Sequence, residues 1–288
     1  MPNFLIIGAQ KAGTTALHRY LDQHPEVYMS PVKETNFFAL EGKRLDFCGP
    51  RDRDVLERSE NVASMTDIEG YRRLFGGVAG EKAIGEASPL YLCSPEAPGR
   101  IRRYVPEAKL VAVLRNPVER AYSGFLMMRA CGREPIADFA SALREEGRRA
   151  KDNWEHSWHY KRMGFYHTQL KRYYDAFDRG QIGIYLHEDL DADTLGTLQN
   201  LFGFLGVDGT FVPDVSVRHN VSGVRKNGAS PAPPGEPDPL SAGLEERDIL
   251  GPHPPPEVRS WLAAEYREDI RKLQDLIQRD LSGWLECP

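Results

Sequence analysis

Residues 4–21, F-L-I-I-G-A-Q-K-A-G-T-T-A-L-H-R-Y-L, constrain the fold more than any other stretch of this chain. Four apolar residues, Phe4 to Ile7, form the short run that a buried parallel strand requires, and Gly8 ends that run. Beyond Gly13, apolar residues recur at helical spacing, so the loop between the two glycines should end at a helix N-terminus. The first turn of a helix has unpaired N–H groups and the positive end of the helix dipole. The unit therefore predicts a cradle for an anion such as phosphate.

The lysine of this loop, Lys11, lies in an unusual place for a nucleotide-binding sequence. A Walker A motif, G-x-x-x-x-G-K-[ST], has its lysine after the second glycine, whereas Lys11 precedes Gly13. A lysine inside the loop lies beside the oxygen that bridges a bound phosphate and the group that leaves it. A Walker lysine instead lies between the outer phosphates of a nucleoside triphosphate. A structural turn after a strand is the alternative that a glycine loop by itself leaves open.

Length and charge limit the class of protein. A chain of 288 residues, 41% hydrophobic and 27% charged, can bury a large core and has the composition of a globular enzyme. Its net charge of −5 argues against a general binder of nucleic acid or of anionic membranes, because such proteins depend on a dominant positive field. Any basic site must therefore be local.

Location and metal binding follow from what the sequence lacks. It has no run of 18 apolar residues and no signal peptide pattern at its N-terminus, so we expect a cytoplasmic protein. Its cysteines are widely scattered and form no C-x-x-C pair, which predicts neither a zinc site nor a disulfide framework. These residues are Cys48, Cys93, Cys131 and Cys287.

Strands and helices alternate along the chain. Apolar runs predict further strands at 83–86, 109–114 and 182–186, and a short extended segment lies between 24 and 31. This alternation implies a single α/β domain over residues 1–288, with a P-loop-like central parallel sheet of four to five strands flanked by helices. Ligands of such sheets bind at the carboxyl ends of the strands.

Start and stop signals place several of the helices. A T-x-x-E capping box from Thr66 to Glu69 predicts one helix start, and Ser94 is expected to cap the next helix. Residues 135–178 read as helical throughout, with Gly147 and Gly164 as expected breaks. Further helices are predicted at 195–205 and 258–277, and a mobile Pro/Gly-rich loop at 229–256.

A second basic site follows the strand at 109–114. Arg115 ends that strand, and Ser123 lies eight positions later on a helix that opens at Pro117. An arginine at a strand end and a serine on the next helix can hold one phosphate together, through a guanidinium fork and a hydroxyl. An arginine that merely caps the sheet is the alternative.

The two segments together resemble the cofactor motifs of sulfotransferases that use 3′-phosphoadenosine 5′-phosphosulfate (PAPS). They read G-A-Q-K-A-G-T-T at 8–15 and L-R-N-P-V-E-R-A-Y-S at 114–123, and the heparan sulfate sulfotransferase-like group with its bacterial relatives is the nearest pattern. The resemblance implies that Arg115 and Ser123 bind the 3′-phosphate of the donor, whose product is adenosine 3′,5′-bisphosphate. It also implies that the 5′-phosphosulfate is bound by Lys11, Ala12, Gly13, Thr14 and Thr15.

Other segments extend the resemblance over most of the chain. E-T-N-F-F at 34–38 is similar to the segment in which the family places its catalytic glutamate, which maps onto Glu34. G-E-A-S-P-L-Y at 85–91 is similar to a substrate-side loop, although some carbohydrate-modifying relatives have lysine in place of Ala87. Arg225 and Lys226 occupy the family's late cofactor loop and would close over the 3′-phosphate, with a solvated basic turn as the alternative.

The aromatic residues of the middle segment have two interpretations. Trp154, Trp158 and Tyr160 are candidates to line the acceptor pocket, but aromatic residues at i and i+4 are more often part of a core.

The resemblance implies transfer of a sulfuryl group from PAPS to a hydroxyl, or as second choice an amine, of a small molecule or glycan. Lys11 and Glu34 are the expected catalytic residues, and no metal is required because Lys11 can neutralise the leaving phosphate. A P-loop kinase is the alternative enzyme, but it requires a Walker lysine and an acidic magnesium ligand. A nucleotide-binding regulatory protein that has lost its chemistry is a third possibility. The sequence leaves the acceptor and the oligomeric state open.

Overall fold

Five parallel strands form the centre of the computed structural model, which describes residues 1–51, 65–216, 251 and 253–286. The strands are β1 (Phe4–Gly8), β2 (Val27–Met29), β3 (Ala83–Ala87), β4 (Lys109–Leu114) and β5 (Ile182–Leu186). They are hydrogen-bonded in the order β2-β3-β1-β4-β5, and every neighbouring pair is parallel. The predicted α/β fold with a sheet of four to five strands is confirmed, and the segment between 24 and 31 supplies the fifth strand.

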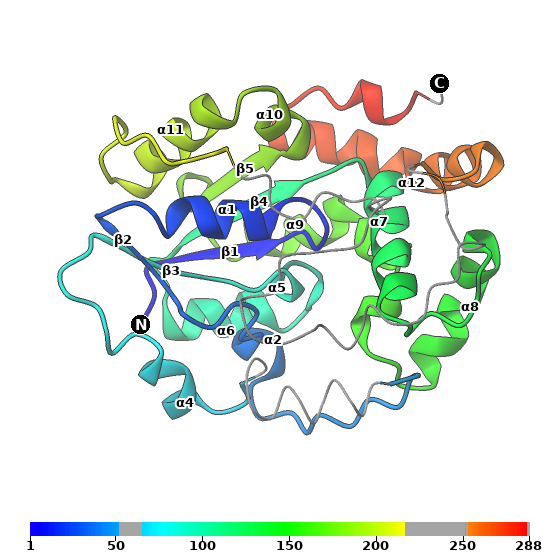
Figure 1. Cartoon of the computed structure of the whole chain (residues 1–288), viewed down its shortest axis with the longest axis horizontal. Helices are drawn as coiled ribbons and strands as arrows, with labels where there is room; N and C mark the ends of the chain where they lie inside the picture. Colours follow the sequence, from blue (N-terminus) through cyan, green and yellow to red (C-terminus); the bar gives the residue numbers. More distant parts are fainter. Residues whose placement is uncertain (52–64, 217–250, 252, 287–288) are drawn as a thin grey trace.

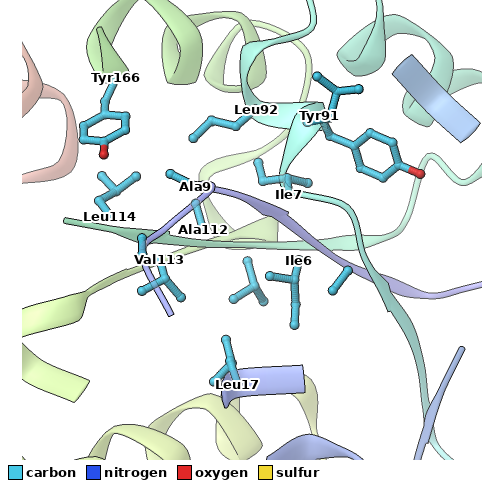
Figure 2. Close-up of a cluster of buried hydrophobic side chains, with 14 of the residues drawn as sticks. Ile6, Ile7, Ala9, Leu17, Tyr91, Leu92, Ala112, Val113, Leu114 and Tyr166 are labelled. Carbon is cyan, nitrogen blue, oxygen red and sulfur yellow. The ribbon is translucent and has the colours of Figure 1, made fainter. Parts of the chain in front are cut away.

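Helices cover both faces of this sheet (Figure 1). They are α1 (Thr14–Leu21), α2 (Phe37–Leu40), α4 (Ile68–Arg73), α5 (Leu90–Cys93), α6 (Ala97–Tyr104), α7 (Pro117–Ala130), α8 (Phe139–Lys151), α9 (Tyr166–Tyr174), α10 (His187–Ala192), α11 (Thr194–Leu205) and α12 (Pro256–Ile277). Figure 2 shows Ile6 on the side of the sheet that faces Leu17 of α1. Its neighbour Ile7 points to the opposite side, where Leu92 of α5 lies. Because β1 is covered on both faces, its apolar run is continuous rather than alternating.

Two helix starts differ from the sequence prediction. Helix α4 begins after Asp67, whose carboxylate accepts a hydrogen bond from the backbone N–H of Gly70 at 2.6 Å. Thr66 is therefore not the cap, and its carbonyl instead accepts from the N–H of Gly42. Ser94 does not cap α6 either, because its hydroxyl donates to the carboxylate of Glu96 at 3.0 Å.

The long helix predicted over 135–178 is divided into α8, two 3₁₀ turns at His156–Trp158 and Arg162–Gly164, and α9. Gly147 lies inside α8 and does not break it, whereas Gly164 does lie at a break. The interruption has a physical cause in Glu146 of α8. Its carboxylate accepts hydrogen bonds from the backbone N–H groups of Lys161 and Arg162, which are thereby satisfied without a continuous helix.

The C-terminal part returns to the core through α12, and the indole of Trp284 donates to Glu188 at 3.0 Å. Most of the predicted mobile loop at 229–256 lies outside the described residues. Among the residues that are described, no helix is both long and apolar enough to cross a membrane.

Candidate active site

The carboxyl ends of β1 and β4 meet at one point of the sheet edge. The N–H of Ala9, the first residue after β1, donates to the carbonyl of Val113 at 2.7 Å. The chain then turns through two positive φ angles, 69° at Lys11 and 98° at Gly13, and enters α1. A guanidinium nitrogen of Arg115 donates to the carbonyl of Lys11 at 3.3 Å. The structure thus brings together the two basic residues that the sequence predicted at these strand ends.

The side chain of Lys11 is in an electropositive and poorly solvated place. Burial, followed by the positive charge of Arg115, lowers the pKa of the Lys11 ammonium, while the charge of Glu34 acts in the opposite direction. A bound anion would offset the repulsion between these two positive charges. Gly13, as N-cap of α1, has no side chain to accept hydrogen bonds from the first N–H groups of the helix, so these donors are available to an anion or to water.

The two glycines of this loop serve different purposes. Gly13 adopts a left-handed φ that most residues avoid. At Gly8, a Cβ atom would lie only 2.6 Å from the Cβ of Leu92, so glycine is needed there for α5 to pack against the strand end.

Ser123 belongs to the same strand–helix unit as Arg115. The side chain of Asn116 caps α7 by accepting from the N–H groups of Val118 and Glu119 at 3.0 and 3.5 Å. Ser123 lies about two turns into this helix and is buried. Ala12 and Thr14 of the phosphate loop are also buried, and Thr15 is half-buried.

Glu34 reaches the same edge from β2. After that strand the chain continues beside β3, with the N–H of Ser30 bonded to the carbonyl of Gly85 and the N–H of Glu34 bonded to that of Ala87. The Glu34 carboxylate forms an ion pair with the ammonium of Lys33, and its side chain remains 45% exposed. An exposed carboxylate within electrostatic range of Lys11 is suited to accept a proton from a bound substrate.

The other predicted residues have different outcomes. Arg225 and Lys226 lie outside the described residues. Trp158 and Tyr160 are fully buried, so the core interpretation holds for them, and Trp154 packs against Trp158 at a ring distance of 4.8 Å.

Comparison with known proteins decides the family. A sequence profile of the sulfotransferase family matches residues 2–211, which is most of the chain. The chain belongs to the sulfotransferase family. The resemblance inferred from the motifs is thereby confirmed, and the P-loop kinase alternative is not favoured.

Similar sulfotransferases include enzymes named for heparan sulfate. The chain is 28% identical over 217 residues to human bifunctional heparan sulfate N-deacetylase/N-sulfotransferase 2, a match that covers 72% of this chain and 22% of that protein. It is 30% identical over 207 residues to mouse heparan sulfate glucosamine 3-O-sulfotransferase 3B1, covering 72% of this chain and 46% of that protein. The chain therefore matches less than half the length of these curated relatives.

A solved structure resembles the fold over its whole length. The crystal structure of a sulfotransferase from Alicyclobacillus acidocaldarius superimposes with a TM-score of 0.79 and 35% identity, and the match covers 99% of both chains.

Sequence reasoning missed a charged cluster next to the phosphate loop between Gly8 and Gly13. Glu155 pairs with His156 at 2.7 Å and with Arg133 at 3.0 Å, and the amide of Gln10 donates to the Ser157 hydroxyl at 3.5 Å. Burial alone would lower the pKa of His156, but the charge and hydrogen bond of Glu155, with the charge of Glu34, raise it. The sequence did not predict this cluster, because residues 135–178 were expected to form a helix, which would not bring these side chains together.

His187 is a second residue that the sequence analysis did not single out. It follows β5 directly, and its Nδ1 would lie 3.5 Å from a Cβ placed on Gly13. Within the described part of the chain, this buried Nδ1 has no hydrogen-bond partner. Burial lowers the pKa of His187, and the charge of Arg115 lowers it further against the opposing charge of Asp191. The strand-end rule that found Lys11 and Arg115 could have found it.

Proposed function

We propose that this sulfotransferase moves a sulfuryl group from PAPS to a hydroxyl group, or as second choice an amine, of a glycan or small molecule. One observation carries the proposal. Lys11, Arg115 and Glu34 follow three different strands, β1, β4 and β2, and lie at the same edge of the sheet. The names of the relatives, which include an N-sulfotransferase and a 3-O-sulfotransferase of heparan sulfate, support both types of acceptor group.

The residues of this edge fit the donor. The paired charges of Lys11 and Arg115 and the open start of α1 suit its phosphate groups, with Ser123 assigned to the 3′-phosphate. Ala12, Gly13, Thr14 and Thr15 are assigned to the 5′-phosphosulfate, and Arg225 and Lys226 to a closing contact over the 3′-phosphate.

The reaction then requires one proton transfer and one displacement at sulfur. An acceptor oxygen bonds to sulfur as the bond from sulfur to the 5′-phosphate oxygen breaks, and Glu34 takes the acceptor proton. Lys11 stabilises the negative charge that builds on the departing oxygen. Positioning and electrostatics supply most of the catalysis, as in phosphoryl transfer. Among the described residues, no group of three or more His, Cys, Asp or Glu side chains is placed to hold a metal ion.

The experiment that tests the function has two parts. Adenosine 3′,5′-bisphosphate should raise the melting temperature of the full chain, whereas ATP with magnesium should not, and the reverse result would support a kinase. Incubation with PAPS and a panel of hydroxyl and amine acceptors should give products that gain the mass of a sulfuryl group. Binding of the bisphosphate with no product on any acceptor would support a regulatory protein.

Cytoplasmic location and the lack of nucleic-acid and membrane partners remain predictions from the sequence.

A further inference from the structure

A buried carboxylate lies directly behind the loop that presents Glu34. Glu86, near the end of β3, has no solvent exposure. Its two oxygens accept hydrogen bonds from the Tyr71 hydroxyl at 3.4 Å and the Ser88 hydroxyl at 2.8 Å. A carboxyl group is costly to bury, so one placed here requires a role that an apolar residue could not fill.

The hydroxyl of Ser88 connects this carboxylate to the loop. Its single proton is donated to Glu86, and its oxygen accepts the backbone N–H of Asn36 at 3.0 Å. The Thr35 hydroxyl lies 3.4 Å from the same oxygen and 3.2 Å from the Tyr91 hydroxyl. Glu86 therefore fixes the direction of a chain of hydrogen bonds that ends on residues 35 and 36.

The loop needs such support because its backbone is unusual. Glu34 and Asn36 have φ angles of 64° and 54°, in the left-handed region that residues with side chains rarely adopt. Conformations of this kind persist only where the surroundings determine them. The contacts of this loop include the bond from the Glu34 N–H to the Ala87 carbonyl at 2.9 Å, the bond from the Met65 N–H to the Thr35 carbonyl at 2.7 Å, and the bond from the Asn36 N–H to the Ser88 hydroxyl.

We propose that Glu86 is a positioning residue, which acts through Ser88 to hold residues 34–36 in the conformation that presents Glu34 to the reacting groups. This inference rests on the proposed role of Glu34 as the base. Glu86 itself is buried and does not touch the substrate.

The ionisation of Glu86 should affect the hydrogen bonds between Ser88 and residues 35 and 36, and this effect can be measured. Burial raises the pKa of Glu86 to about 7, against the opposing hydrogen bonds from Tyr91, Ser88, Tyr71 and Thr35. The tyrosines that face it from α4 and α5 have pKa values raised well above 10 and are neutral donors, and Leu5 of β1 lies opposite it. Protonated Glu86 can donate to Ser88 instead of accepting from it. The Ser88 hydroxyl must then turn its own proton to another acceptor, such as Thr35 Oγ1 at 3.4 Å, so the hydrogen bonds that hold residues 35 and 36 rearrange.

The decisive variant is Ser88→Ala, with Ser94→Ala as matched control. Ser94 is also buried and also donates to a glutamate two residues away, but it lies before α6. Ser88→Ala should lower kcat about ten- to a hundredfold and leave the Kd for adenosine 3′,5′-bisphosphate within about twofold of wild type. In a Glu34→Gln background the same substitution should change kcat less than about twofold, because the group it positions is already gone.

Two further readouts separate positioning from a general loss of structure. Amide hydrogen exchange at Asn36 should become at least about tenfold faster in Ser88→Ala. Wild-type kcat should fall as the pH falls through about 7, where Glu86 becomes protonated, and Glu86→Gln should lose this step. A normal kcat in Ser88→Ala, equal losses in both serine variants, or unchanged exchange at Asn36 would each overturn the proposal. A wild-type chain that transfers no sulfuryl group would refute the proposed function, while the Asn36 exchange would still test whether Ser88 holds the loop.

Discussion

At the residue scale, Lys11 and Glu34 share a left-handed backbone conformation. Both have φ angles near 65°, a backbone conformation whose free energy is about 1 kcal/mol higher for a residue with a side chain than for glycine. Each position therefore retains a charged side chain against a local backbone preference. Arg51, an exposed residue, also has a positive φ of 57°, so the assignment of Lys11 and Glu34 to the reaction depends on their place at the sheet edge and not on this angle alone.

Lys11→Ala should lower kcat as well as weaken donor binding. The ammonium strengthens its contact as negative charge builds on the oxygen between phosphorus and sulfur, so its loss is felt mainly in the transition state. Steady-state kinetics at saturating PAPS measure this effect. A variant with normal kcat and only a raised KM would show that Lys11 is a plain anion clamp.

Arg115→Ala should act on binding. Loss of charge-assisted hydrogen bonds to the 3′-phosphate should cost roughly 1.5–3 kcal/mol, or on the order of ten- to a hundredfold in donor affinity. Calorimetry should also show that the variant no longer prefers adenosine 3′,5′-bisphosphate over 5′-AMP. Arg179→Ala is the control. Arg179 lies before β5, at the amino ends of the parallel strands and so at the opposite edge of the sheet from Arg115, and it donates to the Leu276 carbonyl. An unchanged preference in Arg115→Ala would rule out this assignment.

Glu34→Gln should abolish proton acceptance while keeping the size of the side chain. Turnover on an alcohol acceptor should fall by at least about a hundredfold, with donor affinity nearly intact. Glu26→Gln serves as control. Glu26 lies before β2, whereas Glu34 lies after it, and the Glu26 carboxylate pairs with Lys82 away from the site. If Glu34→Gln keeps most of its turnover, the base lies elsewhere, and His156 and His159 become the candidates. His24, a third histidine of interest in the sequence, lies before β2 like Glu26 and bonds through both ring nitrogens to backbone groups.

At the scale of elements, the segment from 134 to 160 is fixed beside the site by a buried ion pair. Arg149 of α8 forms two hydrogen bonds to Glu134, at 2.7 and 2.8 Å, and the side chains of both residues have no exposure. The Tyr160 hydroxyl donates to the same carboxylate at 2.8 Å. No residue pattern predicts such pairing, since the partners lie 15 and 26 positions from Glu134 and their helical spacing suggested a continuous helix.

Glu134→Ala should strongly destabilise the fold, because it leaves the Arg149 guanidinium buried without its counter-charge. The expected loss in free energy of unfolding is about 3–5 kcal/mol. Glu145→Ala removes a partner of Arg148 on the same helix, but that pair is solvent-exposed and should cost less than about 1 kcal/mol. Urea denaturation of the two variants measures the difference. Similar losses in both would contradict the importance of the buried pair.

At the scale of the whole molecule, parallel topology brings together residues that are far apart in the sequence. Lys11 and Arg115 could be predicted because each directly follows a strongly apolar strand. Glu34 was found only through the family resemblance, since β2 has three residues and the loop that follows it takes its shape from β3. The cluster around His156 depends on side-chain contacts between separate elements, which a local pattern does not contain.

The pH dependence of stability is also a property of the whole fold, and His159 provides a test of it. Burial, followed by the charges of His156 and Arg162, lowers the pKa of His159 to about 4 from its usual 6.5. Between these values the unfolded chain binds a proton that the folded chain does not, so stability falls as the pH falls through this window. Glu86 acts in the opposite direction, because its raised pKa favours the folded state at the acid end.

The comparison of wild type with His159→Gln therefore isolates the histidine. Above pH 6.5 the difference in free energy of unfolding between the two proteins should be constant. Below it, wild type should lose stability relative to the variant by up to about 1.4 kcal/mol per pH unit, the limit for one proton. Urea denaturation at steps from pH 7 to pH 4.5 gives the difference curve, with His253→Gln as a control at a histidine whose side chain is 73% exposed. A flat difference curve for His159→Gln would mean that the folded protein protonates His159 as readily as the unfolded chain does.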